Sequence, residues 1–235
     1  MIEALERTRL LVGDDGLSRL QSARVIVFGV GGVGSWAVEA LARTGIGHLT
    51  IVDMDDVAPS NLNRQLVASV SAIGSPKAQV LKTRLADVAP TCSVTALSRR
   101  YSAEDADSFD LPSYDYVIDA IDSLSDKADL IRRVADIEGG PTLFSSMGAA
   151  RKLDSTQVQV ADFWKVNGCP LARALRKKFK REKTAPSKGF LCIFSPEQGE
   201  NKVESPDGAN GSIAHVTGVF GLFLANLVVN DILSK

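Results

Sequence analysis

A chain of 235 residues, 45% hydrophobic and 23% charged, is long enough for one large globular domain or for one domain with an appendage. Its formal net charge of -1 excludes a global attraction to nucleic acid, so contact with nucleic acid requires a local basic patch. Three cysteines without a C-x-x-C pair argue against a disulfide framework or a four-cysteine zinc site, and they are typical of a protein in the reducing cytoplasm.

Strand and helix patterns alternate in the first two thirds of the chain. Two short helices are expected at 3–11 and 17–23, before a β-branched strand at 24–28. The pattern then predicts helices at 33–43, 76–88 and 125–138, and strands at 49–53, 93–97, 116–120 and 142–146. This alternation indicates a parallel sheet with right-handed crossovers, and ligands bind such sheets beyond the carboxyl ends of the strands.

The pattern changes after Gly148. The elements expected beyond it are a strand at 156–160, a basic helix at 170–181, a strand at 191–194, a long loop at 198–211 and an apolar helix at 213–233. The apolar stretch Val216–Val229 is shorter than the roughly 18 residues of a membrane span, so we expect a buried helix, or one covered by a partner subunit, and no membrane contact.

These elements together predict the fold class and the domain organisation. We expect an α/β fold, with a Rossmann-like, mostly parallel sheet flanked by helices and a C-terminal extension of strands, a basic helix and an apolar terminal helix. A nucleotide-binding core at about 22–148 and a substrate-binding and dimer extension at about 149–235 are expected to form one domain.

A glycine-rich turn follows the first predicted strand. Gly29, Gly31 and Gly34 match the pattern G-x-G-x-x-G, to which Gly32 adds a further glycine. Such glycines let backbone N–H groups approach a phosphate at the start of a helix. Asp53 follows about 20 residues later at a strand end, where an acid binds ribose hydroxyls. The turn predicts nucleotide binding without distinguishing NAD from ATP.

Polar residues after the second strand favour ATP. A dehydrogenase has no need of Asn61, Arg64 and Lys77 at these positions. An enzyme that transfers the α-phosphate of ATP does need such residues. A guanidinium binds phosphate oxygens in a bidentate manner and an ammonium is a compact charge. Both stabilise the charge that builds on the α-phosphate and the departing pyrophosphate. The alternative for each residue is a solvated polar loop.

The fourth predicted strand is followed by a pair of aspartates. A carboxylate at a strand end beside the nucleotide is well placed to hold Mg²⁺ on the phosphates. We expect Asp122 to be this ligand, because the alternation of side chains along the strand directs Asp119 the other way or into the sheet. Alternatively, Asp122 is an acid that interacts with the helix dipole.

Taken together, five motifs resemble those of the ubiquitin-activating-enzyme-like adenylating superfamily. They are Gly29-x-Gly31-Gly32-x-Gly34, Asp53-x-Asp55, Ser60-Asn61-x-Asn63-Arg64-Gln65, Pro76-Lys77 and Asp119-x-x-Asp122. Within the superfamily, the chain is most similar to the bacterial tRNA threonylcarbamoyladenosine dehydratases. That similarity lies at 31–36, 42–47, 53–57, 117–123, 154–160 and 170–172, so the resemblance covers nearly the whole chain.

The resemblance implies an ATP- and Mg²⁺-dependent cyclisation. ATP adenylates the carboxylate of the threonylcarbamoyl group on the adenosine beside a tRNA anticodon. The neighbouring carbamoyl group attacks the activated carbonyl, AMP leaves, and a ring closes with net loss of water. Proximity within the substrate supplies the attack, so no enzyme nucleophile is required.

The resemblance also implies roles for individual residues. The residues expected to be catalytic are Arg64, Lys77, Asp122 and Arg7, with Asp122 as the metal ligand. Those expected to bind the nucleotide are Gly29, Gly31, Gly32, Gly34, Asp53, Asp55, Asn61, Arg64, Lys77 and Ser123. Arg7 is expected to reach the partner's site in a homodimer, the alternative being a surface arginine.

Two further features bear on the partners. The helix at 170–181 carries six cations and no acid before Glu182, which favours a salt-sensitive contact with tRNA phosphates over an ordinary solvated face. Its cations are Arg173, Arg176, Lys177, Lys178, Lys180 and Arg181. A sulfur-relay or cysteine desulfurase-type protein is a further candidate partner. Cys192 is the candidate for a covalent step, although a small buried hydrophobe is the favoured interpretation.

Other functions remain open on the sequence alone. One alternative function is adenylation of the C-terminal glycine of a ubiquitin-like or sulfur-carrier protein. Two features argue against it: the zinc-binding cysteine pairs of such enzymes are missing, and a basic helix suits an RNA substrate better. A nucleotide-sensing module without turnover would not need the set Arg64, Lys77 and Asp122. An NAD oxidoreductase is a more distant alternative.

Overall fold

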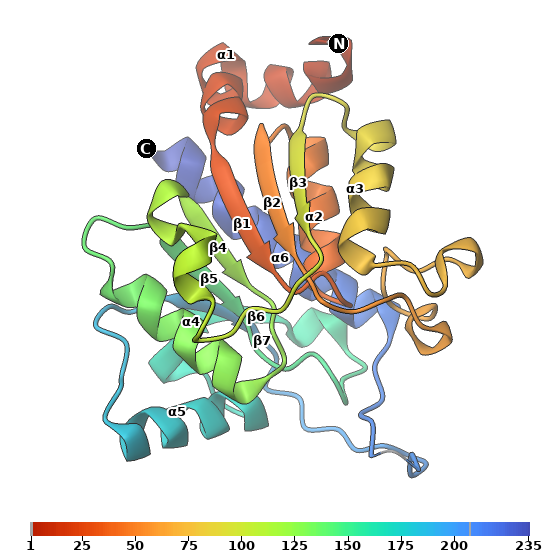
Figure 1. Cartoon of the computed structure of the whole chain (residues 1–235), viewed down its shortest axis with the longest axis vertical. Coiled ribbons are helices and arrows are strands. Elements are labelled where there is room, and N and C mark those ends of the chain that lie inside the picture. Colours follow the sequence, from red (N-terminus) through yellow and green to blue (C-terminus); the bar gives the residue numbers. More distant parts are fainter. Residues whose placement is uncertain (1, 207) are drawn as a thin grey trace.

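The computed structural model describes residues 2–206 and 208–235. Within these residues, seven strands form one sheet in the order β3-β2-β1-β4-β5-β7-β6 (Figure 1). The strands are β1 (Arg24–Phe28), β2 (His48–Val52), β3 (Ser93–Leu97), β4 (Tyr116–Asp119), β5 (Thr142–Ser146), β6 (Gln159–Asp162) and β7 (Leu191–Phe194). Every neighbouring pair is parallel except β6 and β7. The prediction of a mostly parallel sheet is confirmed.

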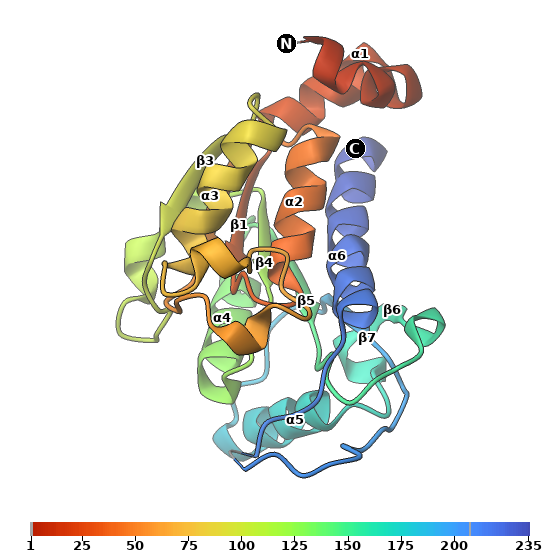
Figure 2. The same cartoon turned by 90° about the vertical axis from the view of Figure 1, so that its right-hand side faces the viewer.

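Helices cover both faces of the sheet. They are α1 (Glu6–Ser22), α2 (Gly34–Thr44), α3 (Lys77–Val88), α4 (Leu124–Asp136), α5 (Pro170–Glu182) and α6 (Ala214–Ser234). Figure 2 shows α2, α3 and α6 on one face of the sheet, with α4 and α5 on the other side. Because both faces are covered, the strands are buried apolar runs rather than alternating ones.

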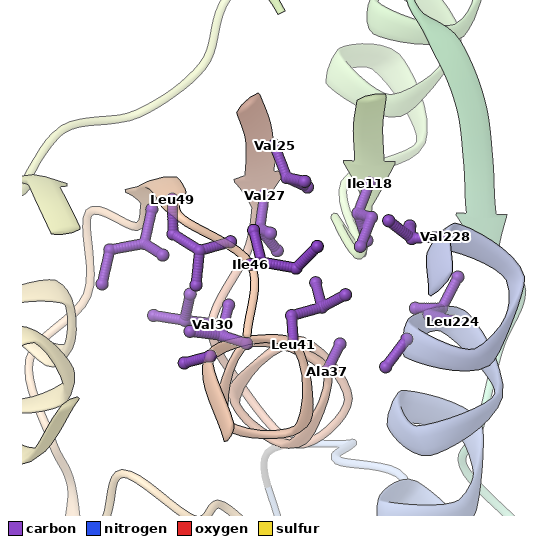
Figure 3. Packing of buried hydrophobic residues seen from close by; sticks show 14 of the residues in the cluster. Val25, Val27, Val30, Ala37, Leu41, Ile46, Leu49, Ile118, Leu224 and Val228 are labelled. Carbon is purple, nitrogen blue, oxygen red and sulfur yellow. The ribbon is translucent and has the colours of Figure 1, made fainter. Parts of the chain in front are cut away.

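The two faces of β1 contribute to two separate hydrophobic clusters. Val25 and Val27 pack with Leu41 of α2 and Leu224 of α6 (Figure 3), while Phe28 belongs to the cluster beneath α4 and α5. This division follows from the period of two along a strand. The glycine-rich turn follows directly after β1. Because β1 is packed on both faces, the turn has a fixed position at the carboxyl edge of the sheet.

The predicted strands at 93–97, 142–146 and 191–194 have the predicted bounds, and the strand predicted at 156–160 does not. A short 3₁₀ helix, Ser155–Gln157, occupies its first half and β6 begins at Gln159. The Asp154 carboxylate accepts the N–H of Thr156 at 2.9 Å and caps this turn. The capping by Asp154 thus favours a helical turn over the first half of the strand that the alternation of side chains predicted.

The two short helices expected at the N-terminus are confirmed. They follow each other within α1 and are separated by a kink at Gly13, where φ is +75°, so residues 14–16 belong to the second helix rather than to a longer turn. The C-terminal helix α6 has 21 residues and is long and apolar enough, by length and composition alone, to cross a membrane. It packs as a core helix, because Val216, Phe220 and Leu224 are fully buried against α2 and the sheet.

Candidate active site

A cavity of about 930 Å³ opens beyond the carboxyl ends of β1, β2, β4 and β5, where ligands bind in such sheets. Most residues predicted to bind the nucleotide line it. They are Gly29, Gly31, Gly32, Asp53, Asp55, Asn61, Arg64, Lys77 and Ser123, together with the predicted metal ligand Asp122. Gly34 is buried behind the cavity wall, and Arg7 lies on α1 at the amino end of the strands (Figure 2).

The glycines of the turn are required by close backbone contacts. Gly29 has φ +87°, and a Cβ there would lie 2.7 Å from the Ala120 carbonyl oxygen. A Cβ at Gly34 would lie 1.8 Å from the Gly29 carbonyl oxygen. The start of α2 has no side-chain cap. The Ser35 N–H donates to the Gly31 carbonyl oxygen at 3.2 Å, while the N–H groups of Gly34 and Trp36 have no acceptor among the described residues and are available to an anion. The turn therefore has the geometry of a phosphate site.

Asp53 connects the glycine-rich turn to the segment after β2. One carboxylate oxygen accepts the N–H of Val30 at 2.7 Å, and the other accepts the N–H of Asp55 at 2.9 Å. Burial raises the pKa of Asp53, and these two hydrogen bonds oppose the shift. The sequence predicted only a ribose contact for Asp53, so its role in holding the turn is an additional finding.

The three polar residues after β2 are held in position by the protein. Lys77 is 5% exposed at the start of α3, and its Nζ donates to Asp55 at 2.8 Å. The Arg64 guanidinium donates to the Ser60 carbonyl oxygen at 2.7 Å. The Asn61 side-chain oxygen accepts the N–H of Ala58 at 3.0 Å, which turns its amide NH₂ toward other partners. These donors are pre-organised on one wall of the cavity.

The two aspartates after β4 have different environments, as the alternation of side chains predicted. Asp122 is exposed in the cavity wall, whereas Asp119 is fully buried. The Asp119 carboxylate accepts the Ser145 hydroxyl at 2.7 Å and lies 2.8 Å from Nζ of Lys127, which is also fully buried. The interpretation of Asp119 as pointing into the protein is confirmed.

Lys127 is a buried residue beside the site that no motif predicted. A signal for it exists, because Lys127 lies four residues before Ile131 and seven before Val134, on the buried face of α4. A lysine on such a face needs an internal anion, and Asp119 is the strand-end acid that its helix covers. The spacing of a strand-end aspartate and a lysine within the apolar helical stripe would have predicted the pair.

The acidic residues of the cavity suit a magnesium ion that arrives with the nucleotide. The described residues contain no group of three or more histidine, cysteine or acidic side chains able to hold a metal. Mg²⁺ commonly uses one or two carboxylates together with substrate phosphates and water, rather than a cage of protein ligands. Asp122 beside the glycine-rich turn fits that donor set.

Four further cations, none of them predicted, line the cavity. The Arg99 guanidinium lies 4.0 Å from the ring centroid of Phe109, and Arg100 forms an ion pair with Asp126 at 2.7 Å. Arg151 and Lys152 follow β5. Lys152 is 4% exposed, and burial lowers its pKa. Each pair of cations is adjacent in the sequence and matches no motif, which is why they were not recognised.

The basic helix α5 starts at the cavity, because Pro170 and Leu171 line it. Its cations are not equivalent. Arg176 is half-buried and donates to the Phe163 carbonyl oxygen at 3.0 Å, while Lys178 and Arg181 pair with Glu182 at 2.9 and 2.8 Å. The exposed side chains beyond these are Arg173, Lys177 and Lys180.

Cys192 is fully buried in β7, and burial raises its thiol pKa well above the ordinary value. It is not part of the cavity wall. A reactive cysteine needs an accessible thiolate, so the environment of Cys192 matches the favoured interpretation as a small buried hydrophobe.

Comparisons with known proteins agree with this geometry. The model of the ThiF family matches residues 5–235. The chain belongs to the ThiF family. The chain is 39% identical over 247 residues to the tRNA threonylcarbamoyladenosine dehydratase of Bacillus subtilis, covering 99% of this chain and 96% of that protein. The crystal structure of the Escherichia coli tRNA N6-threonylcarbamoyladenosine dehydratase in complex with ATP is 35% identical, with a TM-score of 0.89 over 99% of this chain and 95% of that one.

A more distant relative lies outside the dehydratases. The sulfur carrier protein adenylyltransferase of Thermus thermophilus is 36% identical over 136 residues, which is 58% of this chain and 49% of that protein. The similarity to the two dehydratases thus extends over nearly the whole chain, and the similarity to the carrier-activating enzyme covers little more than half of it.

Proposed function

We propose that this ThiF-family protein is an ATP-dependent tRNA threonylcarbamoyladenosine dehydratase. The observation that carries the proposal is the convergence of the glycine-rich turn, Lys77 and Asp122 on one cavity, in a chain that matches dehydratases over nearly its full length. The substrate is the threonylcarbamoyl group on the adenosine beside the anticodon of tRNA. The product is the cyclised nucleoside, formed with net loss of water.

The chemistry takes place in two steps. A carboxylate oxygen of the substrate bonds to the α-phosphorus of ATP, and the bond to pyrophosphate breaks. The carbamoyl group then attacks the activated carbonyl carbon, and the bond to AMP breaks as the ring closes. Lys77 and Arg64 bind the phosphates and stabilise the charge that develops on them, while the N–H groups of Gly34 and Trp36 at the start of α2 provide further donors.

Mg²⁺ is the metal that we propose for the site, with Asp122 as its protein ligand. When bound, it would neutralise charge on the phosphates and the departing pyrophosphate. Asp53 and Asp55 line the same cavity, where Asp53 holds the glycine-rich turn and Asp55 holds Lys77.

We also propose a homodimer in the cytoplasm. Arg7 is exposed on α1, at the end of the sheet opposite its own cavity, so its proposed role is to reach the cavity of another subunit. The outer face of α6 offers an apolar surface for such a contact, with Leu222 49% exposed and Phe223 partly exposed. A sulfur-relay or cysteine desulfurase-type protein is proposed as a further partner on the strength of the family resemblance.

The alternative function is adenylation of the C-terminus of a ubiquitin-like or sulfur-carrier protein. It uses the same phosphate wall, but the outward-facing cations of α5 have no role in it. A substrate made of RNA gives Arg173, Lys177 and Lys180 a function beside the cavity mouth.

Mass spectrometry of nucleosides tests the proposal. tRNA that carries threonylcarbamoyladenosine is incubated with the protein, ATP and Mg²⁺, then digested. Loss of one water from that nucleoside, together with formation of AMP, is expected. An unchanged nucleoside would contradict the proposal, and AMP formed only after addition of a carrier protein would favour the alternative.

A further inference from the structure

One cation of the cavity has no partner among the residues that the structure describes. Six cationic side chains line the cavity, and within residues 2–206 and 208–235 five of them donate to protein oxygens. The five are Arg64 with Ser60 and Asn63, Lys77 with Asp55, Arg99 with Ser108, Arg100 with Asp126, and Lys152 with Ser195 and Glu197. The sixth is Arg151, whose guanidinium makes no hydrogen bond or ion pair with any described residue.

The backbone of Arg151 is held in an unusual conformation. Its φ is +59°, in the left-handed region that glycine adopts without strain. Two contacts enforce it. The Arg151 N–H donates to the Gly211 carbonyl oxygen at 2.8 Å, and a Cβ at Gly199 would lie 2.2 Å from the Arg151 carbonyl oxygen. Strain that the surroundings enforce is concentrated at functional sites, and here it supports an exposed guanidinium in the cavity wall.

Neighbouring charges leave this guanidinium available. Lys152 is buried on two backbone carbonyl oxygens and does not reach a ligand without losing them. The Glu197 carboxylate accepts the N–H groups of Leu153 and Asp154 at 2.9 and 3.0 Å, so its charge is used to hold the loop. The uncharged Asn210 and Ser212 complete this side of the cavity.

Arg151 lies between the segment that carries Arg64 and the start of α5. Its N–H donates to the Gly211 carbonyl oxygen, and the next residue, Ser212, accepts the side-chain amide of Asn63 at 2.9 Å. The segment after β5 also approaches α5, because a Cβ at Gly148 would lie 3.8 Å from the Leu171 side chain. Pro170, Leu171 and Arg151 line the same cavity as Arg64, so this part of the wall is open to a second reactant beside the phosphates.

The second reactant in the proposed function is an anion. Its carboxylate must approach the α-phosphate, which is also negatively charged, so a further cation in the cavity wall removes part of the repulsion. A guanidinium binds a carboxylate in a bidentate manner and fixes its orientation. We propose that Arg151 binds the carboxylate of the threonylcarbamoyl group and selects the modified tRNA from the unmodified one; this inference rests on the proposed function.

Binding of two tRNAs tests the inference. The same tRNA, with and without the threonylcarbamoyl group, is titrated into the full-length protein in the presence of a non-hydrolysable ATP analogue. The wild type is expected to prefer the modified tRNA. Arg151→Gly should reduce affinity for the modified tRNA by about tenfold to a hundredfold, which is the range for a lost charge-assisted hydrogen bond, and leave the unmodified tRNA unaffected.

Arg151→Gly also separates binding from folding. Glycine adopts a φ of +59° without strain, so the variant should melt no lower than the wild type. Lys183→Gly is the matched control, because Lys183 is an exposed cation with φ +55° that lies outside the cavity. This control should change the affinity for both tRNAs equally or leave both unchanged.

The outcomes are distinct. An equal loss of affinity for both tRNAs would mean that Arg151 contacts an RNA phosphate, and unchanged affinities would mean that it contacts neither; each result overturns the inference. If the wild type forms no AMP with the modified tRNA, the proposed function itself fails. If the wild type forms AMP and Arg151→Gly keeps its preference for the modified tRNA, only the inference fails.

Discussion

Lys127 and Asp119 form a fully buried ion pair, with 2.8 Å between Nζ and Oδ2, beneath the turn that carries Asp122. The Lys127 ammonium also donates to the Ile121 carbonyl oxygen at 3.0 Å, and the other Asp119 oxygen accepts the N–H of Ile121 at 3.1 Å. Both backbone polar groups of the residue before Asp122 are therefore held by this pair.

Breaking the pair should be costly. Lys127→Met leaves the Asp119 carboxylate buried without its cation, which should lower the free energy of unfolding by about 3–5 kcal/mol. The double variant Asp119→Asn with Lys127→Met carries no buried charge and should recover part of that loss. Denaturant unfolding of the three proteins measures this. A single variant as stable as the wild type would show that the pair contributes nothing.

The phosphate wall should affect catalysis far more than stability. Lys77→Met and Arg64→Ala are each expected to lower kcat for AMP formation by about 10²–10³-fold, as loss of a charge-stabilising donor does in other active sites. Because Asp55, the partner of Lys77, is half exposed, the melting temperature should change little. Arg43→Ala, outside the cavity, is the control. Normal turnover in both cavity variants would refute their phosphate roles.

The outward side of α5 should set the salt dependence of tRNA binding. Arg173→Glu and Lys177→Glu are each expected to weaken binding of modified and unmodified tRNA alike, and to reduce the slope of log K against log salt by about one per lost phosphate contact. Lys82→Glu, an equivalent charge reversal on the exposed side of α3, should have no such effect. Identical slopes for all three variants would mean that α5 is only a solvated surface.

Stability at low pH should depend on Glu39. Burial of its carboxylate acts to raise the pKa, but hydrogen bonds from Arg84 and Arg43 outweigh burial, so the pKa lies below its ordinary value of 4.5. The carboxylate therefore stabilises the folded state fully above pH 4.5, and this contribution is lost as the pH falls through the folded-state pKa. Glu39→Gln should lower the free energy of unfolding by about 1 kcal/mol at pH 7, a small value because solvent screens the exposed arginines. In strong acid, the substitution should have almost no effect. Urea unfolding at both pH values measures the difference. A constant difference would contradict the assignment.

The order of the main elements and much of the phosphate wall were predictable from the sequence. Local sequence signals predict these features. β-branched runs predict the strands, the spacing of the glycines predicts the turn, and the period of two along a strand predicts the direction of Asp119. The remaining residues depend on tertiary contacts. Arg151 is conspicuous only once Gly199 and Gly211 are seen to clamp its backbone, and these glycines lie about 50 and 60 residues further along the chain. Likewise, Arg176 is not a free surface cation, because its guanidinium donates to the carbonyl oxygen of Phe163, 13 residues earlier in the chain.

The most direct test of the account is the fate of the substrate's carboxylate oxygens. tRNA bearing a threonylcarbamoyl group labelled with ¹⁸O in its carboxylate is incubated with the protein, unlabelled ATP and Mg²⁺, and the nucleotide products are weighed by mass spectrometry. Adenylation predicts AMP that carries one ¹⁸O atom, with the second ¹⁸O retained in the cyclised nucleoside. Label in inorganic phosphate together with ADP, or AMP without label, would contradict attack of the carboxylate on the α-phosphate.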